Sequence, residues 1–316
     1  MAAAPLPRRE RVKARFIFNP HSGANRRSPR LRDRAAEFIA HHNWDAHVVA
    51  TERPRHATEL TRRAVEDGCA MVVAIGGDGT MNEVATALIG TPVIFGLIPC
   101  GSGNGLGRHL GIPRAGRGAL RTLATGRVIE IDAGEVNGFP FFCAAGLGFE
   151  SLIASRFATL ESRGFAGYLR ESLRAWRQFE PEPCVIHHAG SAVPVAVFTL
   201  AVANSSQYGN NAYIAPGASV HDGLLDLTVV PRVHWSNALP LVWHLFNGSI
   251  DRGEGITRLR AGAFAIERTK PGWIHTDGEP RATGRRLEFS VRPRSLRIIV
   301  PSTAAGCRFN PRVGCG

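Results

Sequence analysis

Four short apolar runs, separated by segments with helical spacing, fill the first hundred residues of the chain. Predicted strands end near residue 19 and span 46–51, 71–75 and 93–99, and predicted helices span 29–42, 56–66 and 81–89. Continuous apolar strands that alternate with helices are typical of a parallel sheet covered by helices on both faces. Such sheets bind ligands beyond the carboxyl ends of their strands. We therefore expect an α/β domain with its site at that edge.

The pattern changes after about Ile131, where short β-prone runs with turns between them replace the alternation. They predict a mainly antiparallel β-sandwich, interrupted by helical stretches at 150–179 and 235–247. A last strand, LRIIVP (296–301), is expected to return to the first domain. The predicted organisation is an α/β domain over 1–131, a β-rich domain over 132–295, and a return strand and tail over 296–316.

Charge and cysteine content restrict the partners of the chain. A net charge of +12 favours polyanions such as nucleotide phosphates or acidic lipid head groups. No zinc finger or aromatic-interleaved basic motif occurs in the sequence, so nucleic acid is not an expected partner. No apolar run reaches the roughly 18 residues needed to span a bilayer. The six cysteines form no CxxC pair and are expected to be reduced thiols of a cytoplasmic protein.

The run AIGGDGTMNEV (74–84) is the most specific local signal. Its three glycines let the backbone approach a bulky ligand, and its N–H groups, with a helix beginning near Met81, form an anion site. Thr80 is predicted to cap that helix. Asp78 would repel a phosphate unless a divalent cation lay between them, and no P-loop lysine is present. Mg²⁺ bridging Asp78 to the phosphates accounts for both features; the alternative is a tight turn with Asp78 merely solvated.

Two further segments add to this signal. IPCGSGNGLGRHLGIP (98–113) is a second glycine turn, which alone is equally compatible with an ordinary loop. Beside the first turn it favours a nucleotide held between the two. In HTDGEP (275–280), Glu279 is the candidate base that accepts a hydroxyl proton as a phosphoryl group arrives. Taken by itself, that turn is more often a plain surface turn.

The order of five segments resembles the diacylglycerol kinase and sphingosine kinase superfamily of lipid kinases: NPHSG (19–23), GGDGTMNEV (76–84), PCGSGNGLGRHLGIP (99–113), HDGLLDL (221–227) and DGEP (277–280). GGDGT alone is shared with NAD kinases, whereas the GSGN loop with GIP soon after is more particular to lipid kinases. The resemblance covers nearly the whole chain. It implies direct, Mg²⁺-dependent transfer from ATP to a lipid hydroxyl, with Glu279 and Asp78 as catalytic residues.

The two turns and the resemblance together predict an ATP site and a metal site. The expected ATP-binding residues are Asn19, Thr51, Gly76, Gly77, Asp78, Gly79, Thr80, Asn82, Glu83, Gly101, Ser102, Gly103 and Asn104. The resemblance also implies a structural magnesium site made by the Asp222 carboxylate and the backbone carbonyls of Ser219 and Leu224. Gly105 stands where many bacterial members have aspartate, and Glu150 where aspartate is frequent, so diacylglycerol is not secured as the acceptor.

Two other functions remain open at this point: a kinase for a soluble nucleotide such as NAD, and a catalytically silent lipid-binding protein. The expected partner is a membrane lipid, reached by peripheral contact with the anionic inner membrane surface, and a homodimer is compatible with the sequence. The apolar segment 234–248 is expected to pack into the core rather than to face lipid.

Overall fold

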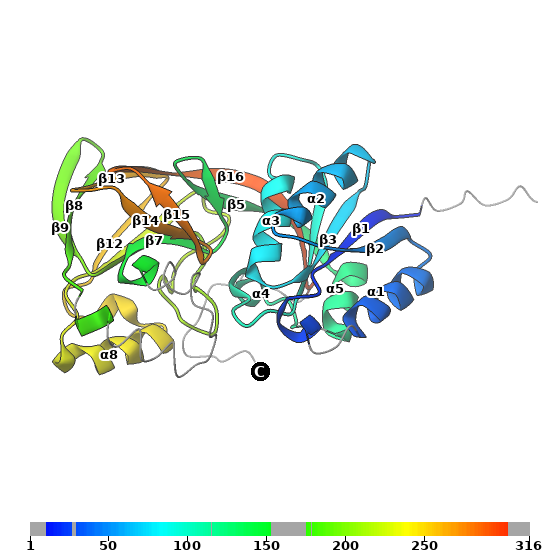
Figure 1. The fold of residues 1–316 in the computed structure, drawn as a ribbon, viewed down its shortest axis with the longest axis horizontal. Helices are drawn as coiled ribbons and strands as arrows, with labels where there is room; N and C mark the ends of the chain where they lie inside the picture. The colour runs from blue at the N-terminus through cyan, green and yellow to red at the C-terminus, as the bar shows by residue number, and fades with distance from the viewer. Residues whose placement is uncertain (1–10, 27–29, 115, 153–174, 178, 303–316) are drawn as a thin grey trace, which may run out of the picture.

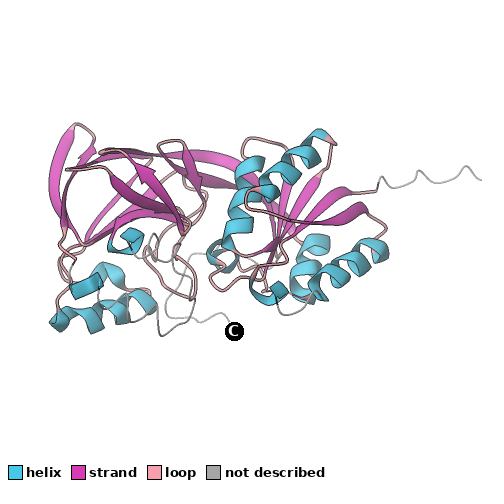
Figure 2. Cartoon of the chain, in the orientation of Figure 1, coloured by secondary structure: helices cyan, strands magenta, loops and turns pink. Residues whose placement is uncertain are grey.

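A computed structural model of the chain describes residues 11–26, 30–114, 116–152, 175–177 and 179–302. The chain forms two bodies side by side, and Figure 1 shows an α/β domain on the right and a β-rich domain on the left. Helices lie on both faces of the sheet in the α/β domain, as the secondary-structure colouring of Figure 2 makes plain. The predicted fold class, an α/β domain followed by an antiparallel β domain, is confirmed.

The α/β domain is built on parallel strands in the order β2-β1-β3-β4, followed by the end of β16. Its elements are β1 (Lys13–Phe18), η1 (Gly23–Arg26), α1 (Arg30–His41), β2 (Asp45–Ala50), α2 (His56–Glu66), β3 (Met71–Gly76), α3 (Asp78–Leu88), β4 (Ile94–Pro99), α4 (Gly105–His109) and α5 (Arg117–Thr125). These bounds agree closely with the predicted strands and helices, except that α3 begins three residues earlier than Met81. The predicted Thr80 cap is therefore wrong, because Thr80 lies inside the first turn of α3.

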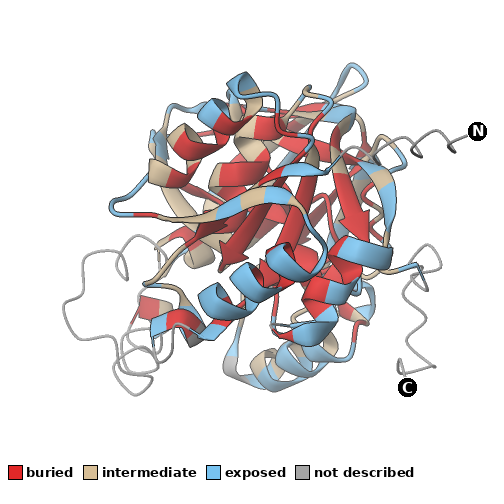
Figure 3. Cartoon of the chain, turned by 90° about the vertical axis from the view of Figure 1, so that its right-hand side faces the viewer, coloured by how far each residue is buried: buried red, intermediate tan, exposed pale blue. Residues whose placement is uncertain are grey.

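Apolar spacing explains how the helices cover this sheet. In α1 the buried residues are Leu31, Ala35, Phe38 and Ile39, which share one helix face. Strand β3 is buried along its whole length, as expected of a strand covered on both faces. Figure 3 shows these buried strands at the centre of the domain with helices outside them.

The β-rich domain contains two sheets that enclose one apolar core. A six-stranded antiparallel sheet has the order β12-β11-β10-β7-β14-β15, and the other layer is formed by β16, β13, β8 and β9, with β5 and β6 beside β16. Buried residues of both layers, such as Leu200, Ile274 and Phe289, pack in the same cluster. The elements are β5 (Arg127–Val136), β6 (Phe139–Phe141), β7 (Ala144–Gly148), β8 (Glu182–His188), β9 (Ser191–Val197), β10 (Thr199–Ala203), β11 (Leu225–Val230), α8 (Trp235–Phe246), η2 (Ile250–Arg252), β12 (Thr257–Ala261), β13 (Ala263–Arg268), β14 (Gly272–Thr276), β15 (Glu279–Thr283) and β16 (Arg286–Val300).

Strand β16 belongs to both domains. It pairs with β13 in the second domain and with β4 in the first, so a single ten-stranded sheet crosses the molecule (Figure 1). Its pairing with β5 shifts register between Arg292 and Leu296, as at a bulge that bends a strand. The predicted domain limits at 131/132 and 295/296 fall inside β5 and β16, and they stay a prediction.

The two helical stretches predicted for the second domain have different outcomes. Most of the first, 150–179, lies outside the described residues. The second is confirmed as α8, but only part of its apolar surface packs into the core: Leu241 and Leu245 do so, whereas Leu239 and Trp243 are exposed. Within the described residues, no helix combines the length and apolar character needed to cross a membrane.

Candidate active site

The first glycine turn lies where β3 ends and α3 begins. A Cβ on Gly76 would come within 2.5 Å of the Thr80 Cβ, so the turn can close only around glycine. The Gly77 N–H donates to the Ser22 hydroxyl at 3.2 Å. The Thr80 hydroxyl accepts a hydrogen bond from the Asn19 side-chain amide at 2.8 Å. The turn is thus fixed to the end of β1, and three predicted ATP-binding residues, Asn19, Gly76 and Thr80, lie together.

The second glycine turn touches the first through backbone atoms. A Cβ on Gly101 would lie 2.7 Å from the Gly77 Cα, so the two turns approach more closely than any side chain would allow. Asn104 has a positive φ of 53°, a conformation that asparagine tolerates better than most residues. Its side chain closes the turn by accepting from the Gly101 N–H at 2.9 Å and donating to the Gly101 carbonyl at 2.7 Å. The two cradles therefore form one continuous surface.

Asp78 joins the two turns. Its carboxylate accepts hydrogen bonds from the backbone N–H groups of Asn104 at 2.9 Å and Gly105 at 3.0 Å. Gly103 packs against it, because a Cβ there would lie 2.8 Å from the Asp78 Oδ2. Asp78, Gly103 and the exposed Ser102 line one cavity. Asp78 thus holds the second turn in place and also faces the space that a ligand would enter.

The remaining residues predicted to bind ATP in the first domain are held by structural contacts. Glu83 accepts from the N–H groups of Arg55 at 3.2 Å and Ala57 at 3.0 Å, at the start of α2. Burial raises the pKa of Glu83, although these N–H groups oppose the change. Thr51 is buried after β2, and its N–H donates to the Phe18 carbonyl. Their part in ATP binding stays a prediction.

Asp277 connects the second domain to the first. Its carboxylate accepts hydrogen bonds from the N–H groups of Phe142, Cys143 and Ala144 at 2.8, 2.8 and 3.1 Å, and from the Asn82 side-chain amide at 2.8 Å. Burial raises the pKa of Asp277, and these hydrogen bonds oppose that rise. Asn82, which was predicted to bind ATP, therefore belongs to the first domain and contacts the second domain.

Glu279 reaches across to the first glycine turn. Its Oε1 lies 3.7 Å from the position that a Cβ on Gly79 would occupy. Its other oxygen accepts a hydrogen bond from Arg281 at 2.8 Å. Although Gly79 and Glu279 are far apart in sequence, the pairing of β14 with β7 and β15 brings Glu279 to the edge of the first domain. The predicted base and the predicted phosphate turn are thus neighbours.

A cavity of about 300 Å³ lies between Asp78 with the second glycine turn and a wall of polar side chains from the second domain. The His275 Nε2 lies 3.2 Å from the Glu150 Oε1. Burial alone would lower the pKa of His275, but the Glu150 carboxylate outweighs it and the net change is upward. Burial, and then the same carboxylate, raises the pKa of Tyr208 well above its ordinary value. The wall can therefore hold a hydroxyl-bearing group by hydrogen bonds.

Comparison with known proteins decides the family. Residues 13–136 match the diacylglycerol kinase catalytic domain, and residues 144–300 match the YegS C-terminal NAD kinase beta sandwich-like domain. A Pseudomonas aeruginosa protein named "Probable lipid kinase YegS-like" is 31% identical over 84% of this chain and 88% of its own length. The chain belongs to the YegS-like lipid kinase and diacylglycerol kinase family.

Other relatives of this lipid kinase family cover the chain as fully. A "Diacylglycerol kinase" from Mycobacterium tuberculosis is 29% identical over 95% of this chain and 99% of its own. A solved diacylglycerol kinase structure from Bacillus anthracis superposes with a TM-score of 0.69 over 93% of this chain and 98% of that chain, at 19% identity. An NAD kinase from Archaeoglobus fulgidus reaches 0.50 over 92% and 95% at 13% identity, which shows a shared fold alone. Membership of a kinase family implies the use of ATP.

The predicted magnesium site of this family member has a single carboxylate. Asp222 Oδ2 lies 2.5 Å from the Arg260 Nη2, and its Oδ1 accepts from the Leu224 N–H at 3.1 Å. The Ser219 hydroxyl is 3.3 Å from the His221 ring. Across the described ranges, no group of three or more His, Cys, Asp or Glu residues could hold a metal ion. An ion at Asp222 would have to share this carboxylate with Arg260, and the site stays a prediction.

The sequence analysis assigned no role to three members of the candidate site: Tyr208, His275 and Asp277. Two of them, His275 and Asp277, belong to the segment HTDGEP (275–280). Tyr208 comes from the loop after β10, next to an isolated bridge between Asn104 and Gly209. No local signal marks that loop, because only the three-dimensional pairing brings it to the second glycine turn.

Proposed function

We propose that this chain is a magnesium-dependent lipid kinase that transfers the γ-phosphoryl group of ATP to the hydroxyl of a membrane lipid. One observation carries the proposal: Glu279 of the second domain lies beside Gly79 in the phosphate turn of the first. A carboxylate next to a phosphate site would only repel its ligand unless it served a proton transfer or a cation. Family membership supports the same conclusion.

The glycine turns would bind the nucleotide phosphates. At the start of α3 the first backbone N–H groups have no partner within the helix and would donate to phosphate oxygens at the carboxyl edge of the sheet. Asp78 is the residue that would hold Mg²⁺, since each carboxylate oxygen can accept more than the one hydrogen bond it has. Mg²⁺ usually binds one or two carboxylates together with phosphates and keeps several waters. When bound, it would neutralise phosphate charge.

Glu279 would act on the acceptor. As the lipid hydroxyl oxygen forms its bond to the γ-phosphorus, the bond from that phosphorus to the β–γ bridging oxygen breaks and ADP leaves. The hydroxyl proton passes to the Glu279 carboxylate. Arg281, 2.8 Å from the other oxygen, fixes the orientation of this carboxylate. A positioned general base of this kind contributes roughly 10²–10⁴-fold.

The second domain's wall would recognise the polar head of the acceptor. Glu150 and His275 lie 3.2 Å apart at a cavity of about 300 Å³, which suits a head group and leaves acyl chains outside. The Glu150 carboxylate accepts hydrogen bonds from hydroxyls, so an acceptor with a free second hydroxyl or an amine fits this wall. Monoacylglycerol and sphingoid bases carry such a second group, whereas diacylglycerol has only the hydroxyl that would be phosphorylated.

The test is transfer of labelled γ-phosphate from ATP and Mg²⁺ to a panel of acceptors in mixed micelles. The panel contains diacylglycerol, monoacylglycerol, sphingosine, ceramide and phosphatidylglycerol, with NAD as the soluble control. Label in one organic-phase product is expected and identifies the acceptor. Label only on NAD would contradict the proposal in favour of a nucleotide kinase. ATP binding without any label would contradict it in favour of a silent lipid-binding protein.

A further inference from the structure

Helix α8 carries an apolar stripe on its outer face. Leu239, Val242, Trp243 and Phe246 are 79, 51, 67 and 54% exposed. Their spacing of three, four and seven residues places them on one side of the helix. These four are half of the eight large hydrophobic side chains that are exposed in the described part of the chain. Contiguous exposed apolar patches of this kind mark interaction sites.

The inner face of α8 is apolar as well. Leu241 and Leu245 pack on a cluster that contains Ala203, Ile214 and Ala215. A helix that is apolar all round normally lies within a core or in contact with lipid. At about 1.5 Å per residue its twelve residues measure about 18 Å, which is too short to span a bilayer. The outer stripe is therefore suited to lie along a surface.

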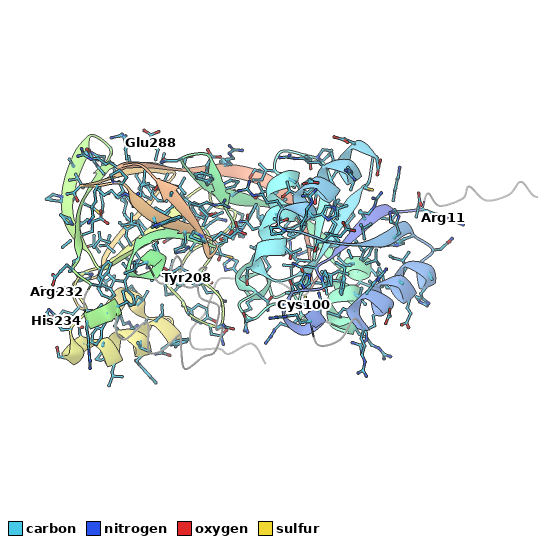
Figure 4. The ribbon with its side chains drawn as sticks, viewed as in Figure 1. Arg11, Cys100, Tyr208, Arg232, His234 and Glu288 are labelled. Atoms are coloured by element: carbon cyan, nitrogen blue, oxygen red, sulfur yellow. The ribbon has the colours of Figure 1, made fainter. Side chains whose placement is uncertain are left out.

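The helix is directly connected to the wall of the candidate active site. The Tyr213 N–H donates to the Leu245 carbonyl at 2.8 Å. Tyr208, which lines the catalytic cavity, packs on the same cluster as Leu241 and Leu245. Figure 4 shows Tyr208 between α8 and the region where the two domains meet. Helix α8 would therefore stand between a surface bound by its outer face and the Tyr208 side of the cavity.

We propose that the outer face of α8 is a membrane-docking surface, and that it lies in the interfacial plane of a bilayer. This proposal rests on the proposed function, because the acceptor of a lipid kinase lies in the membrane. Trp243 suits the boundary between head groups and acyl chains. Leu239, Val242 and Phe246 supply the apolar contact.

Charged side chains around α8 nearly cancel, which fits neither a strongly acidic nor a strongly basic protein partner. The helix contains no aspartate or glutamate. Arg232 precedes it on the exposed surface seen in Figure 4, and Arg252 follows it in η2. The exposed Asp251 and Glu254 offset these arginines locally, so apolar contact supplies the main attraction. The net charge of +12 on the whole chain adds attraction to anionic lipids.

The test is flotation of the full chain with vesicles, without ATP. Vesicles of phosphatidylcholine and phosphatidylglycerol in equal amounts are expected to bind the wild type. The triple variant Leu239→Ser, Trp243→Ser and Phe246→Ser is expected to bind at least tenfold more weakly, with its thermal midpoint retained because these side chains are exposed. Failure of the wild type to bind, or equal binding by the triple variant, would overturn the proposal.

A matched pair of single variants guards against misfolding of the triple variant. Val242 and Val193 are 51 and 49% exposed, the first on α8 and the second on strand β9. Val242→Ser is expected to weaken flotation measurably and Val193→Ser to leave it unchanged. Equal effects of the two would overturn the proposal, as would sedimentation showing that the triple variant disrupts a dimer while vesicle binding stays intact. Vesicle binding needs no turnover, so wild-type flotation without label on any acceptor would refute only the proposed function.

Discussion

The first domain meets the candidate site mainly with two backbone turns and the Asp78 carboxylate, whereas the second domain meets it with a wall of side chains. On one side, Gly77 and Gly101 bring two turns so close that no side chain fits between them, and Asp78 and Ser102 line the cavity beside them. On the other side, Glu150 and His275 lie 3.2 Å apart, and Glu279 lies beside the first turn. Nucleotide binding would thus depend mainly on the shape of the glycine turns, and acceptor binding on the electrostatics of the second domain's side chains.

This difference has a chemical consequence. Backbone N–H groups do not titrate, so binding of phosphates by the glycine turns should vary little with pH. The acceptor wall contains groups whose pKa values are displaced, upward for both His275 and Tyr208. Perturbed pKa values of this kind cluster at functional sites. The pH dependence of turnover is therefore expected to come from the second domain.

The largest effect is expected from a substitution that breaks the contact between the two domains. Asp277→Ala removes the acceptor of four hydrogen bonds, three from backbone N–H groups of the second domain and one from Asn82. Unpartnered donors cost about 1 kcal/mol or more each, so we expect the free energy of unfolding to fall by about 4 kcal/mol. Urea unfolding measures it, with the exposed Asp251→Ala as the control. A loss below about 1 kcal/mol would mean that the contact is not structural.

The next prediction concerns His109, a buried titratable group contributed by the first domain. Its Nδ1 lies 2.9 Å from the Ser206 hydroxyl of the second domain. Burial, and then His221, lowers the pKa of His109 to about 4 from its ordinary value of 6.5. Between pH 6.5 and pH 4, His109 is protonated in the unfolded chain but neutral in the folded chain. The free energy of unfolding therefore decreases as the pH falls through this range. This difference corresponds to about 3 kcal/mol.

The His109→Gln variant isolates that contribution. Between pH 7 and pH 4 its free energy of unfolding should improve relative to the wild type by about 3 kcal/mol, because glutamine does not titrate. Chemical unfolding at several pH values measures the change. His41→Gln, at an exposed position at the end of α1, is the matched control and should follow the wild type. Parallel curves for His109→Gln and the wild type would show that His109 titrates normally.

The smallest of the three effects is expected from a substitution that tests whether the two glycine turns must lie in close contact. In Gly101→Ala the new Cβ would lie 2.7 Å from the Gly77 Cα, and the backbone must shift. Overpacking of this kind costs about 2 kcal/mol, and the displaced turns should also weaken ATP binding. Gly284→Ala is the control, since nothing lies within 4 Å of its Cβ position. If the two variants had equal unfolding free energies and equal ATP affinities, the close contact between the turns would matter neither for stability nor for ATP binding.

The same contrast explains how much the sequence could predict. Glycine turns are contiguous, and the alternation of apolar strands with helices places them at one sheet edge, so that side of the site was predictable from residues near one another in the chain. The acceptor wall combines Glu150, Tyr208 and His275 from three separate segments. Their meeting depends on antiparallel pairings such as β7 with β14, which no local pattern specifies.

Helix α8 shows a second limit of sequence reasoning. Apolar residues all round a helix predict burial, and half of that prediction is right for Leu241 and Leu245. The exposure of Leu239 and Trp243 depends on which face the rest of the fold leaves uncovered. Thr80 gives a smaller example, because glycine at Gly77 begins the helix without a side-chain cap.

The most direct test of the account is the effect of Glu279→Gln on γ-phosphate transfer to a lipid in mixed micelles at saturating ATP. Glutamine keeps the size of the side chain and an oxygen that can accept from Arg281, but it cannot take a proton from a hydroxyl. The exposed Glu288→Gln on β16 is the matched control. We expect turnover to fall at least about a hundredfold for Glu279→Gln and almost not at all for Glu288→Gln. Retention of most of the wild-type rate by Glu279→Gln would contradict the assignment of Glu279 as the base.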